Sequence, residues 1–355
     1  MYKKRILFTG GAGYIGSHFV HHLVNEHKDW LIVNIDCLSY AGIIENVSDL
    51  DGCENYRFEY GNIQDDFFLS AVFANYDITD VIHLGAESHV DNSVNAPMTF
   101  LFNNTVGTVT LLDIARGYWS HHGGLSGHRF YYFSTDEVFG FLNEEDSPFN
   151  EESKIKPSSP YSASKAAGDL FVGAYHKTYG METLISHCCN VCSGRQMIEK
   201  LIPATIQRIL NDEPIIVYDR GLQSREWIYV DDAVDAAMCV FEKGVPGQAY
   251  NIGSGNECRN IDLVNTLIDL VCKKTGKNAD DVRANIKYVE NARPGHDFRY
   301  AINASKIKAE LGWEGVKNSM YKCLEKTVDW YLENQEWVEK IKSGEYQKIN
   351  EKYMG

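Results

Sequence analysis

The chain has 355 residues, 44% of them hydrophobic, so it has the length of about two domains and can bury a sizeable core. Its 49 acidic residues outnumber its 34 lysines and arginines, and the net charge of −15 argues against a nucleic-acid or anionic-membrane surface. No apolar run approaches the roughly 20 residues of a membrane span, and the N-terminal apolar stretch is too short for a signal peptide. We therefore expect a cytoplasmic protein.

The first unit of the chain has the pattern of a dinucleotide-binding fold. Residues 5–9 predict a strand, and Gly10-Gly11-Ala12-Gly13-Tyr14-Ile15-Gly16 follows directly, ahead of an apolar helical stripe. The glycines permit a tight turn and let a pyrophosphate approach the backbone where the helix begins. Residues 31–35 predict the second strand. Asp36 ends it, 20 residues after Gly16, where a carboxylate would bond a ribose 2′-hydroxyl and repel a 2′-phosphate.

This unit favours NAD over NADP as the cofactor. The alternative is a structural glycine turn beside a solvated aspartate. Further strands are predicted at 56–60, 80–84, 130–133 and 181–186, with a helix over about 98–118 whose inward stripe includes Leu101. Strands that alternate with helices predict an α/β fold, a doubly wound parallel sheet of the Rossmann type, over residues 1–195.

The stretch from Arg129 to Lys165 carries the candidate catalytic residues. Thr135, Asp136 and Glu137 follow a buried strand, at the sheet edge where open α/β folds bind ligands. Ser158-Ser159-Pro160 predicts a helix start, so Tyr161 and Lys165 share one helical face. A nearby ammonium favours the phenolate, and Tyr161 with Thr135 can then take a proton from an alcohol while NAD takes the hydride. A packed surface helix and capping carboxylates are the alternatives.

After about residue 195 the strand–helix rhythm breaks. Residues 199–203 and 224–232 each lead into a helix, 215–218 predict a short strand, 248–252 rejoin the main sheet, and a helical tail begins near 320. We assign 1–195 to an NAD-binding domain with a returning segment near 226–256. Residues 196–355 form a smaller α/β domain that binds the substrate, and segments of the two domains are interleaved.

The cysteines and histidines give no metal-binding pattern. Nine scattered cysteines suit reduced thiols better than a disulfide framework. Cys188, Cys189 and Cys192 are followed by no Cys or His pair at ligand spacing, and His121-His122 also lack such partners. We interpret the cysteines as buried strand-end residues and the histidines as a solvated turn, and we expect no metal.

Several motifs, in one order along the chain, resemble those of a known family. They are Gly10-x-x-Gly13-x-x-Gly16, Glu87-Ser88-His89-Val90-Asp91, Thr135-Asp136-Glu137-Val138, Tyr161 with Lys165, Glu199-Lys200-Leu201-Ile202-Pro203 and Arg293-Pro294-Gly295-His296-Asp297. On these motifs the chain resembles the extended short-chain dehydrogenase/reductase family, and within it the nucleotide-sugar 4,6-dehydratases that act on dTDP-glucose. The resemblance covers about residues 5 to 300.

The resemblance implies conversion of dTDP-glucose to dTDP-4-keto-6-deoxyglucose with bound NAD. Oxidation at carbon 4 acidifies the carbon 5 hydrogen, water leaves across carbons 5 and 6, and the hydride returns to carbon 6. The family's assignment makes Glu137 the base and Asp136 the acid of the elimination. Within the superfamily, 4-epimerases carry small residues at these positions and GDP-mannose dehydratases a Ser-Glu pair.

The glycine motif and the resemblance together imply two sets of binding residues. Around NAD they place Gly10, Gly13, Tyr14, Ile15, Gly16, Asp36, Leu38, Ser39, Asn62, Ile63, Leu84, Ala86, Ser88, Tyr161 and Lys165. Around the nucleotide sugar they place Ser88, His89, Thr135, Asn190, Glu199, Lys200, Leu201, Pro203, Tyr218, Arg225, Asn260, Arg293 and His296. The resemblance also implies a homodimer, through helices near 100–116 and 161–178.

The chain departs from the family pattern at Asn92, Phe139, Cys192-Ser193-Gly194 and Asp219-Arg220. These departures leave the base and the sugar open, and UDP-glucose or another nucleotide sugar is the alternative substrate. A 4-epimerase or decarboxylase on the same scaffold, and a non-enzymatic NAD-binding protein, are the other hypotheses.

Overall fold

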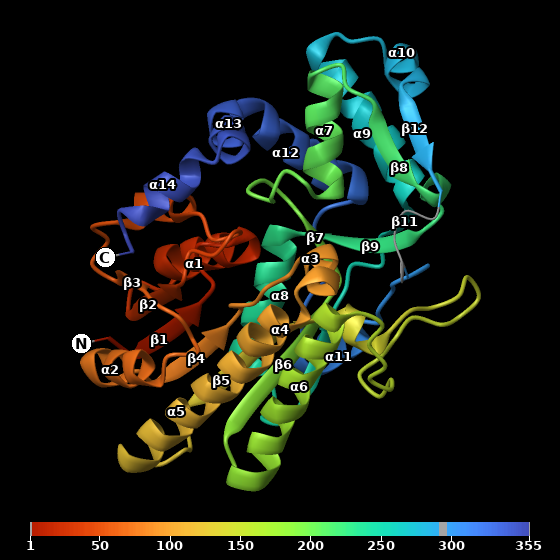
Figure 1. Cartoon of the computed structure of the whole chain (residues 1–355). Coiled ribbons are helices and arrows are strands. Elements are labelled where there is room, and N and C mark those ends of the chain that lie inside the picture. The colour runs from red at the N-terminus through yellow and green to blue at the C-terminus, as the bar shows by residue number, and fades with distance from the viewer. Residues whose placement is uncertain (1, 291–296, 355) are drawn as a thin grey trace.

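The computed structural model describes residues 2–290 and 297–354. Its centre is a seven-stranded sheet in which all neighbouring strands are parallel (Figure 1). In order across the sheet the strands are β10 (Ala249–Ile252), β6 (Glu182–Cys188), β5 (Arg129–Thr135), β4 (Asp80–His83), β1 (Lys4–Thr9), β2 (Trp30–Asp36) and β3 (Tyr56–Tyr60). The strand order reverses between β1 and β4, so the predicted doubly wound α/β fold is confirmed.

Helices cover both faces of the sheet because its strands are apolar on both sides. One face packs against α2 (Asp66–Tyr76), α5 (Thr108–His121) and α6 (Pro160–Tyr179). The other packs against α1 (Tyr14–Glu26), α8 (Val230–Lys243) and α11 (Ser305–Leu311). Along β1, Ile6 and Phe8 belong to the second of these cores and Leu7 to the first, as the alternation of a strand requires.

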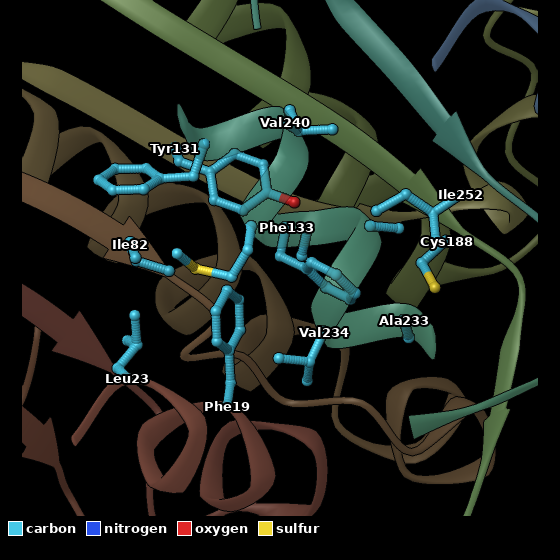
Figure 2. Close-up of a cluster of buried hydrophobic side chains, with 14 of the residues drawn as sticks. Phe19, Leu23, Ile82, Tyr131, Phe133, Cys188, Ala233, Val234, Val240 and Ile252 are labelled. Carbon is cyan, nitrogen blue, oxygen red and sulfur yellow. The ribbon is translucent and has the colours of Figure 1, made fainter. Parts of the chain in front are cut away.

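The core beneath α1 and α8 is continuous with the strands that lead to the site. In Figure 2, Phe19 of α1 points toward Phe133 of β5, with Val234 of α8 beside it. Phe19 is fully buried and meets Phe8 edge-on, with ring centroids 5.4 Å apart. This packing fixes α1, and with it the glycine loop, relative to the sheet.

A second, smaller core joins α7 (Leu201–Leu210), α9 (Asn260–Thr275) and α12 (Met320–Glu333). Its strands form two small sheets, one of β11 (Glu257–Arg259), β9 (Ser224–Tyr229) and β7 (Asn190–Cys192), the other of β12 (Ile286–Val289) and β8 (Ile215–Tyr218). Helix α10 (Ala279–Ala284) packs on α9, and α13 (Gln335–Ser343) and α14 (Glu345–Glu351) end the chain. The division near residue 195 stays a prediction, but residues 302–313, assigned to the second domain, pack in the first core.

Two segments differ locally from their predictions. Residues 224–229, predicted only to lead into a helix, form strand β9 because they pair with β7 on one side and β11 on the other, and the predicted helix follows at Val230. The helix predicted over 98–118 consists of α4 (Pro97–Phe100), a π-helical stretch over Leu101–Gly107, and α5, which continues to His121. The wider turns rotate the apolar stripe, so Leu101 is 41% exposed whereas Leu111 is buried.

None of the helices within the described ranges combines the length and apolar character needed to cross a membrane.

Candidate active site

A cavity of about 350 Å³ opens where the strand order reverses, at the carboxyl ends of β1, β2, β4 and β5. Doubly wound sheets bind their ligands at this point. All five predicted catalytic residues line the cavity, and so do all the predicted cofactor residues except Leu38. The structure therefore brings both sets together in one space.

The glycine loop after β1 leaves no room for a side chain at Gly10 or at Gly16. Gly10 has a φ of +78°, and a Cβ there would stand 2.7 Å from the Cα of Gly85 in the loop after β4. A Cβ on Gly16 would stand 2.0 Å from the carbonyl oxygen of Gly10. A Cβ on Gly13 would meet only that oxygen, at 3.2 Å, beside the cavity. The absence of side chains thus lets a ligand approach the backbone closely.

Helix α1 begins at the same place and presents its N-terminus to the cavity. Its N-cap, Gly13, has no side chain to accept a hydrogen bond from the first turn, and that turn contains no acidic residue. The free N–H groups and the positive end of the helix dipole favour an anion such as a pyrophosphate. These features fit the dinucleotide that the glycine motif predicts.

The carboxylate of Asp36 connects two loops that line the cavity. Its carboxylate accepts hydrogen bonds of 2.9 Å from the backbone N–H groups of both Ala12 and Leu38. Burial raises the pKa of Asp36 to about 6, and the two N–H groups oppose that rise. Leu38 itself is buried and does not line the cavity. Asp36 therefore joins the glycine loop to the loop after β2.

Tyr161 and Lys165 stand on α6, whose start is fixed by a capping box between Ser159 and Ser162, with Pro160 in the first turn. Burial raises the pKa of Tyr161 well above its ordinary value and the nearby Glu137 adds to this, whereas a hydrogen bond with Thr135 lowers it. The Lys165 ammonium donates to the carbonyl oxygen of Phe133 at 2.9 Å. The tyrosine, its threonine partner and the lysine thus share the end of β5.

Burial lowers the pKa of Lys165 to about 8, and the carboxylate of Asp169, one turn further along α6, opposes that shift. Asp169 also accepts a hydrogen bond from His187 at 3.2 Å. The ammonium lies 4.0 Å from the centroid of the Tyr132 ring. The π face and the Asp169 carboxylate both stabilise its charge, so a protonated Lys165 can persist in a buried site at neutral pH.

Asp136 and Glu137 follow Thr135 in a short 3₁₀ turn that the Thr135 hydroxyl caps, accepting a hydrogen bond from the Glu137 N–H at 3.3 Å. Asp136 is 1% exposed, and burial, then the charges of Glu137 and Glu226, raise its pKa well above the ordinary range; Arg225 opposes the rise. Glu137 is only half-buried. The two carboxyl groups therefore occupy different environments, and Asp136 favours its protonated form.

The predicted substrate residues fall into three groups. Ser88, Thr135, Asn190 and Lys200 line the cavity. His89, Glu199, Leu201, Pro203, Tyr218, Arg225 and Asn260 do not. Arg293 and His296 lie outside the described residues. Within the described part of the chain, only the first group lies in the wall of the cavity.

Arg225 is engaged within the protein. It is 8% exposed, donates to the carbonyl oxygens of Ser224 at 2.8 Å and Asp297 at 2.9 Å, and stacks over the Tyr300 ring at 4.4 Å. Its charge nevertheless acts on both Asp136 and Glu137. In this structure Arg225 is a buried cation behind the paired carboxylates rather than part of the cavity wall.

Other residues of the wall were not predicted. Tyr40, Gln196 and Met197 line the cavity, and the Tyr40 hydroxyl donates to the Glu199 carboxylate at 3.2 Å. The nearest nitrogen of His89 lies 4.0 Å from the same oxygen. Glu199 and His89 thus stand together beside Lys200, although neither lines the cavity. Only contacts between distant loops identify Tyr40, and no motif marks it.

The departure Cys192-Ser193-Gly194 lies outside the cavity wall. The thiol of Cys192 contacts the carbonyl oxygen of Ile228 at 3.5 Å, and Ser193 bonds the ring of His18 at 3.0 Å. A Cβ on Gly194 would stand 2.1 Å from the ring of Trp330 in α12. These three residues pack between α1, β9 and α12. No group of three or more His, Cys, Asp or Glu side chains within the described ranges could hold a metal ion.

A glycine loop and a Tyr/Lys pair at one edge of a doubly wound sheet define the short-chain dehydrogenase/reductase class of enzymes. The family model described as GDP-mannose 4,6 dehydratase matches residues 7–326, and the chain belongs to that family. The chain is 43% identical to a dTDP-glucose 4,6-dehydratase of Salmonella typhimurium over 362 residues, covering 99% of each. The predicted resemblance is thereby confirmed.

Two solved structures extend this comparison. A dTDP-glucose 4,6-dehydratase from Bacillus anthracis, in complex with NAD, is 36% identical with a TM-score of 0.84, covering 95% of this chain and 99% of that one. A UDP-glucose 4-epimerase from Thermotoga maritima is 27% identical with a TM-score of 0.80, covering 93% of this chain and 99% of that one. The scaffold is therefore shared by dehydratases and epimerases, and the reaction must be inferred from the site.

The buried carboxyl group of Asp136 predicts a pH-dependent stability. Because its pKa is raised on folding, its contribution is complete below the unfolded value, about 4, and is lost as the pH rises through the folded value. Asp136→Asn should therefore gain stability over the parent protein, by up to about 1.4 kcal/mol per pH unit, between about pH 5 and about pH 8. Urea unfolding without ligands at both pH values measures this, and a pH-independent difference would contradict it.

Proposed function

We propose that the chain is an NAD-dependent dTDP-glucose 4,6-dehydratase, a hydro-lyase that forms dTDP-4-keto-6-deoxyglucose. The observation that carries the proposal is the presence of two adjacent carboxyl groups, those of Asp136 and Glu137, in the cavity that also holds Tyr161, Lys165 and the glycine loop. A simple alcohol dehydrogenase or a 4-epimerase has no use for this pair. The curated relatives of that name, about as long as this chain, support the same reaction.

The residues present fit NAD. The backbone of Gly10 to Gly16 and the N-terminus of α1 would hold the pyrophosphate, and Asp36 would accept a hydrogen bond from the adenosine ribose. When bound, NAD accepts a hydride from the sugar and returns it in the same turnover. The small residues after β4, Gly85 and Ala86, line the cavity and would leave space for the nicotinamide.

Three side chains would manage the protons of the reaction. Tyr161, whose pKa a hydrogen bond with Thr135 lowers, removes the proton of the carbon 4 hydroxyl. Glu137, the more exposed carboxylate, removes the carbon 5 proton that the new ketone has acidified. Asp136, buried and protonated, gives its proton to the departing carbon 6 hydroxyl. Because Asp136 is buried and Glu137 is more exposed, we assign the role of acid to Asp136 and the role of base to Glu137.

The nucleotide half is proposed to bind Asn190, Lys200 and the neighbouring residues of the smaller core, with UDP-glucose as the second candidate substrate. An epimerase is disfavoured because Asp136 would be a buried acid without a role. The protein is proposed to act in the cytoplasm, where its nine cysteines, free in the structure, stay reduced.

Mass spectrometry of an incubated nucleotide sugar tests the reaction class. With dTDP-glucose we expect the product to be lighter by one water. No mass change with altered retention would indicate an epimerase, loss of carbon dioxide from a uronic acid substrate a decarboxylase, and no conversion a binding protein. A panel of dTDP-, UDP-, CDP- and GDP-glucose, compared by kcat/KM, then ranks the base.

Variants of Glu137 and Tyr161 distinguish the oxidation at carbon 4 from the elimination of water. Glu137→Gln should still permit oxidation at carbon 4 but block elimination, so reduced cofactor should accumulate on the enzyme after dTDP-glucose is added. Tyr161→Phe should prevent even that accumulation. Absorbance of reduced nicotinamide in a stopped-flow instrument follows both, and we expect kcat losses of about 100-fold or more. Unimpaired water loss by Glu137→Gln would rule out its role as base.

The protein is proposed to form a homodimer through the π-helical stretch and α6. Leu101, Phe102, Val106, Leu170 and Phe171 are between 40% and 62% exposed, and their two segments pack together. Leu170→Glu should convert a dimer to a monomer, because it places a charge on this apolar surface. Leu222→Glu, at a residue 47% exposed elsewhere, is the control. Sedimentation velocity measures both, and a monomeric parent protein would refute the interface.

A further inference from the structure

The last two helices of the chain, α13 and α14, contact the loop at residues 39–46, which follows β2. The Tyr346 hydroxyl donates to the carbonyl oxygen of Tyr40 at 3.0 Å. The Asn350 side chain bonds the loop twice: its NH₂ group donates to the carbonyl oxygen of Gly42 at 2.7 Å, and its oxygen accepts from the Ile44 N–H at 3.1 Å. In Figure 1, α14, in blue, lies against the orange-red N-terminal part of the chain. Segments about 300 residues apart in sequence are thus joined directly.

Part of the loop at residues 39–46 lines the cofactor cavity. Ser39, Tyr40, Ala41 and Gly42 all line that cavity. Gly42 packs so closely on Asp36 that a Cβ there would stand 2.7 Å from the carboxylate oxygen. Any outward movement of this loop would therefore open the cavity beside the carboxylate proposed to bind the ribose.

The same loop also supports the glycine motif. The Ile43 N–H and the side-chain NH₂ of Asn46 both donate to the carbonyl oxygen of Ala12, at 3.0 and 3.1 Å. The indole N–H of Trp337 in α13 donates in turn to the Asn46 side-chain oxygen at 3.0 Å. A continuous chain of hydrogen bonds therefore runs from the C-terminal helices to the pyrophosphate loop.

A small apolar cluster also links the C-terminal helices to the residues around the cavity. It consists of Ile43, Met197, Ile341 and Tyr346, and Met197 itself lines the cavity. In the loop at residues 39–46, the Tyr40 hydroxyl donates a hydrogen bond to Glu199, which lies in the segment before α7. The C-terminal helices thus contact both walls of the cavity, one from the cofactor side and one from the substrate side.

We propose that α13 and α14 retain the cofactor, with Asn350 and Tyr346 acting as positioning residues through the loop at 39–46. Neither side chain lines the cavity, so each acts only by fixing that loop. Asn350 is 1% exposed and satisfies one backbone N–H and one backbone carbonyl, which would lose their partners without it. The proposal rests on the proposed function in naming NAD as the ligand.

The test compares Asn350→Ala and Tyr346→Phe with a matched control, Asn334→Ala. The Asn334 side chain donates only to the carbonyl oxygen of Trp330, at 2.8 Å, and touches no part of the loop at 39–46. The holoenzymes are loaded with NAD, and its dissociation rate is followed by dilution into an NAD-trapping enzyme. Thermal unfolding of each protein is recorded alongside.

We expect Asn350→Ala to release NAD about tenfold faster than the parent protein, and Tyr346→Phe a few-fold faster, since Tyr346→Phe loses one hydrogen bond to the loop and Asn350→Ala loses two. The KM for added NAD should rise while kcat at saturating NAD stays close to that of the parent. Asn334→Ala should release NAD at the parent rate.

A lower melting temperature with unchanged NAD release in both loop-contacting variants would assign these residues a structural role only and overturn the proposal. If Asn350→Ala does not fold, Tyr346→Phe decides, because it removes a single oxygen atom. A parent protein that binds no NAD would instead overturn the proposed function, an outcome seen before any variant is compared.

Discussion

The close contact between the backbones of Gly10 and Gly85 is the constraint on which the site depends. The loops after β1 and β4 meet where the strand order reverses, and Gly10 cannot carry a side chain there because its Cβ would stand 2.7 Å from the Cα of Gly85. Because the two loops share this space, α1 starts at the cavity with its N-terminus uncovered, and the residues after β4 lie opposite it. The adjacent strand β5 then delivers Thr135, Asp136 and Glu137 to the same edge.

Two acidic residues that are adjacent in the sequence, Asp136 and Glu137, lie in different electrostatic environments. Asp136 and Glu137 are neighbours in a protein of net charge −15, yet the 3₁₀ turn buries the first and leaves the second half-buried. Arg225, held behind them by backbone carbonyls and the Tyr300 ring, offsets part of the repulsion. The difference in burial between the two acids, and with it the raised pKa of Asp136, is thus a property of the fold, produced by one short turn.

Much of this architecture is readable from the sequence because it is written in local patterns. The glycine spacing, Asp36 at the end of β2 and the Tyr161/Lys165 pair each depend on a few neighbouring residues. Strand β9 and the π-helical stretch were missed because pairing with distant strands, and one widened helical turn, override the local pattern. The contacts of Asn350 and Tyr40 join residues far apart in the chain, so no periodicity could reveal them.

The segment Cys192-Ser193-Gly194 departs from the family pattern, and on sequence grounds that departure leaves open which sugar nucleotide is bound. Its surroundings assign it to internal packing: Gly194 lies against the indole of Trp330, and Ser193 against His18. The bulky ring and the missing side chain compensate for each other in volume. Any side chain at position 194 would have to displace the Trp330 ring, so a residue larger than glycine there requires a smaller one in α12.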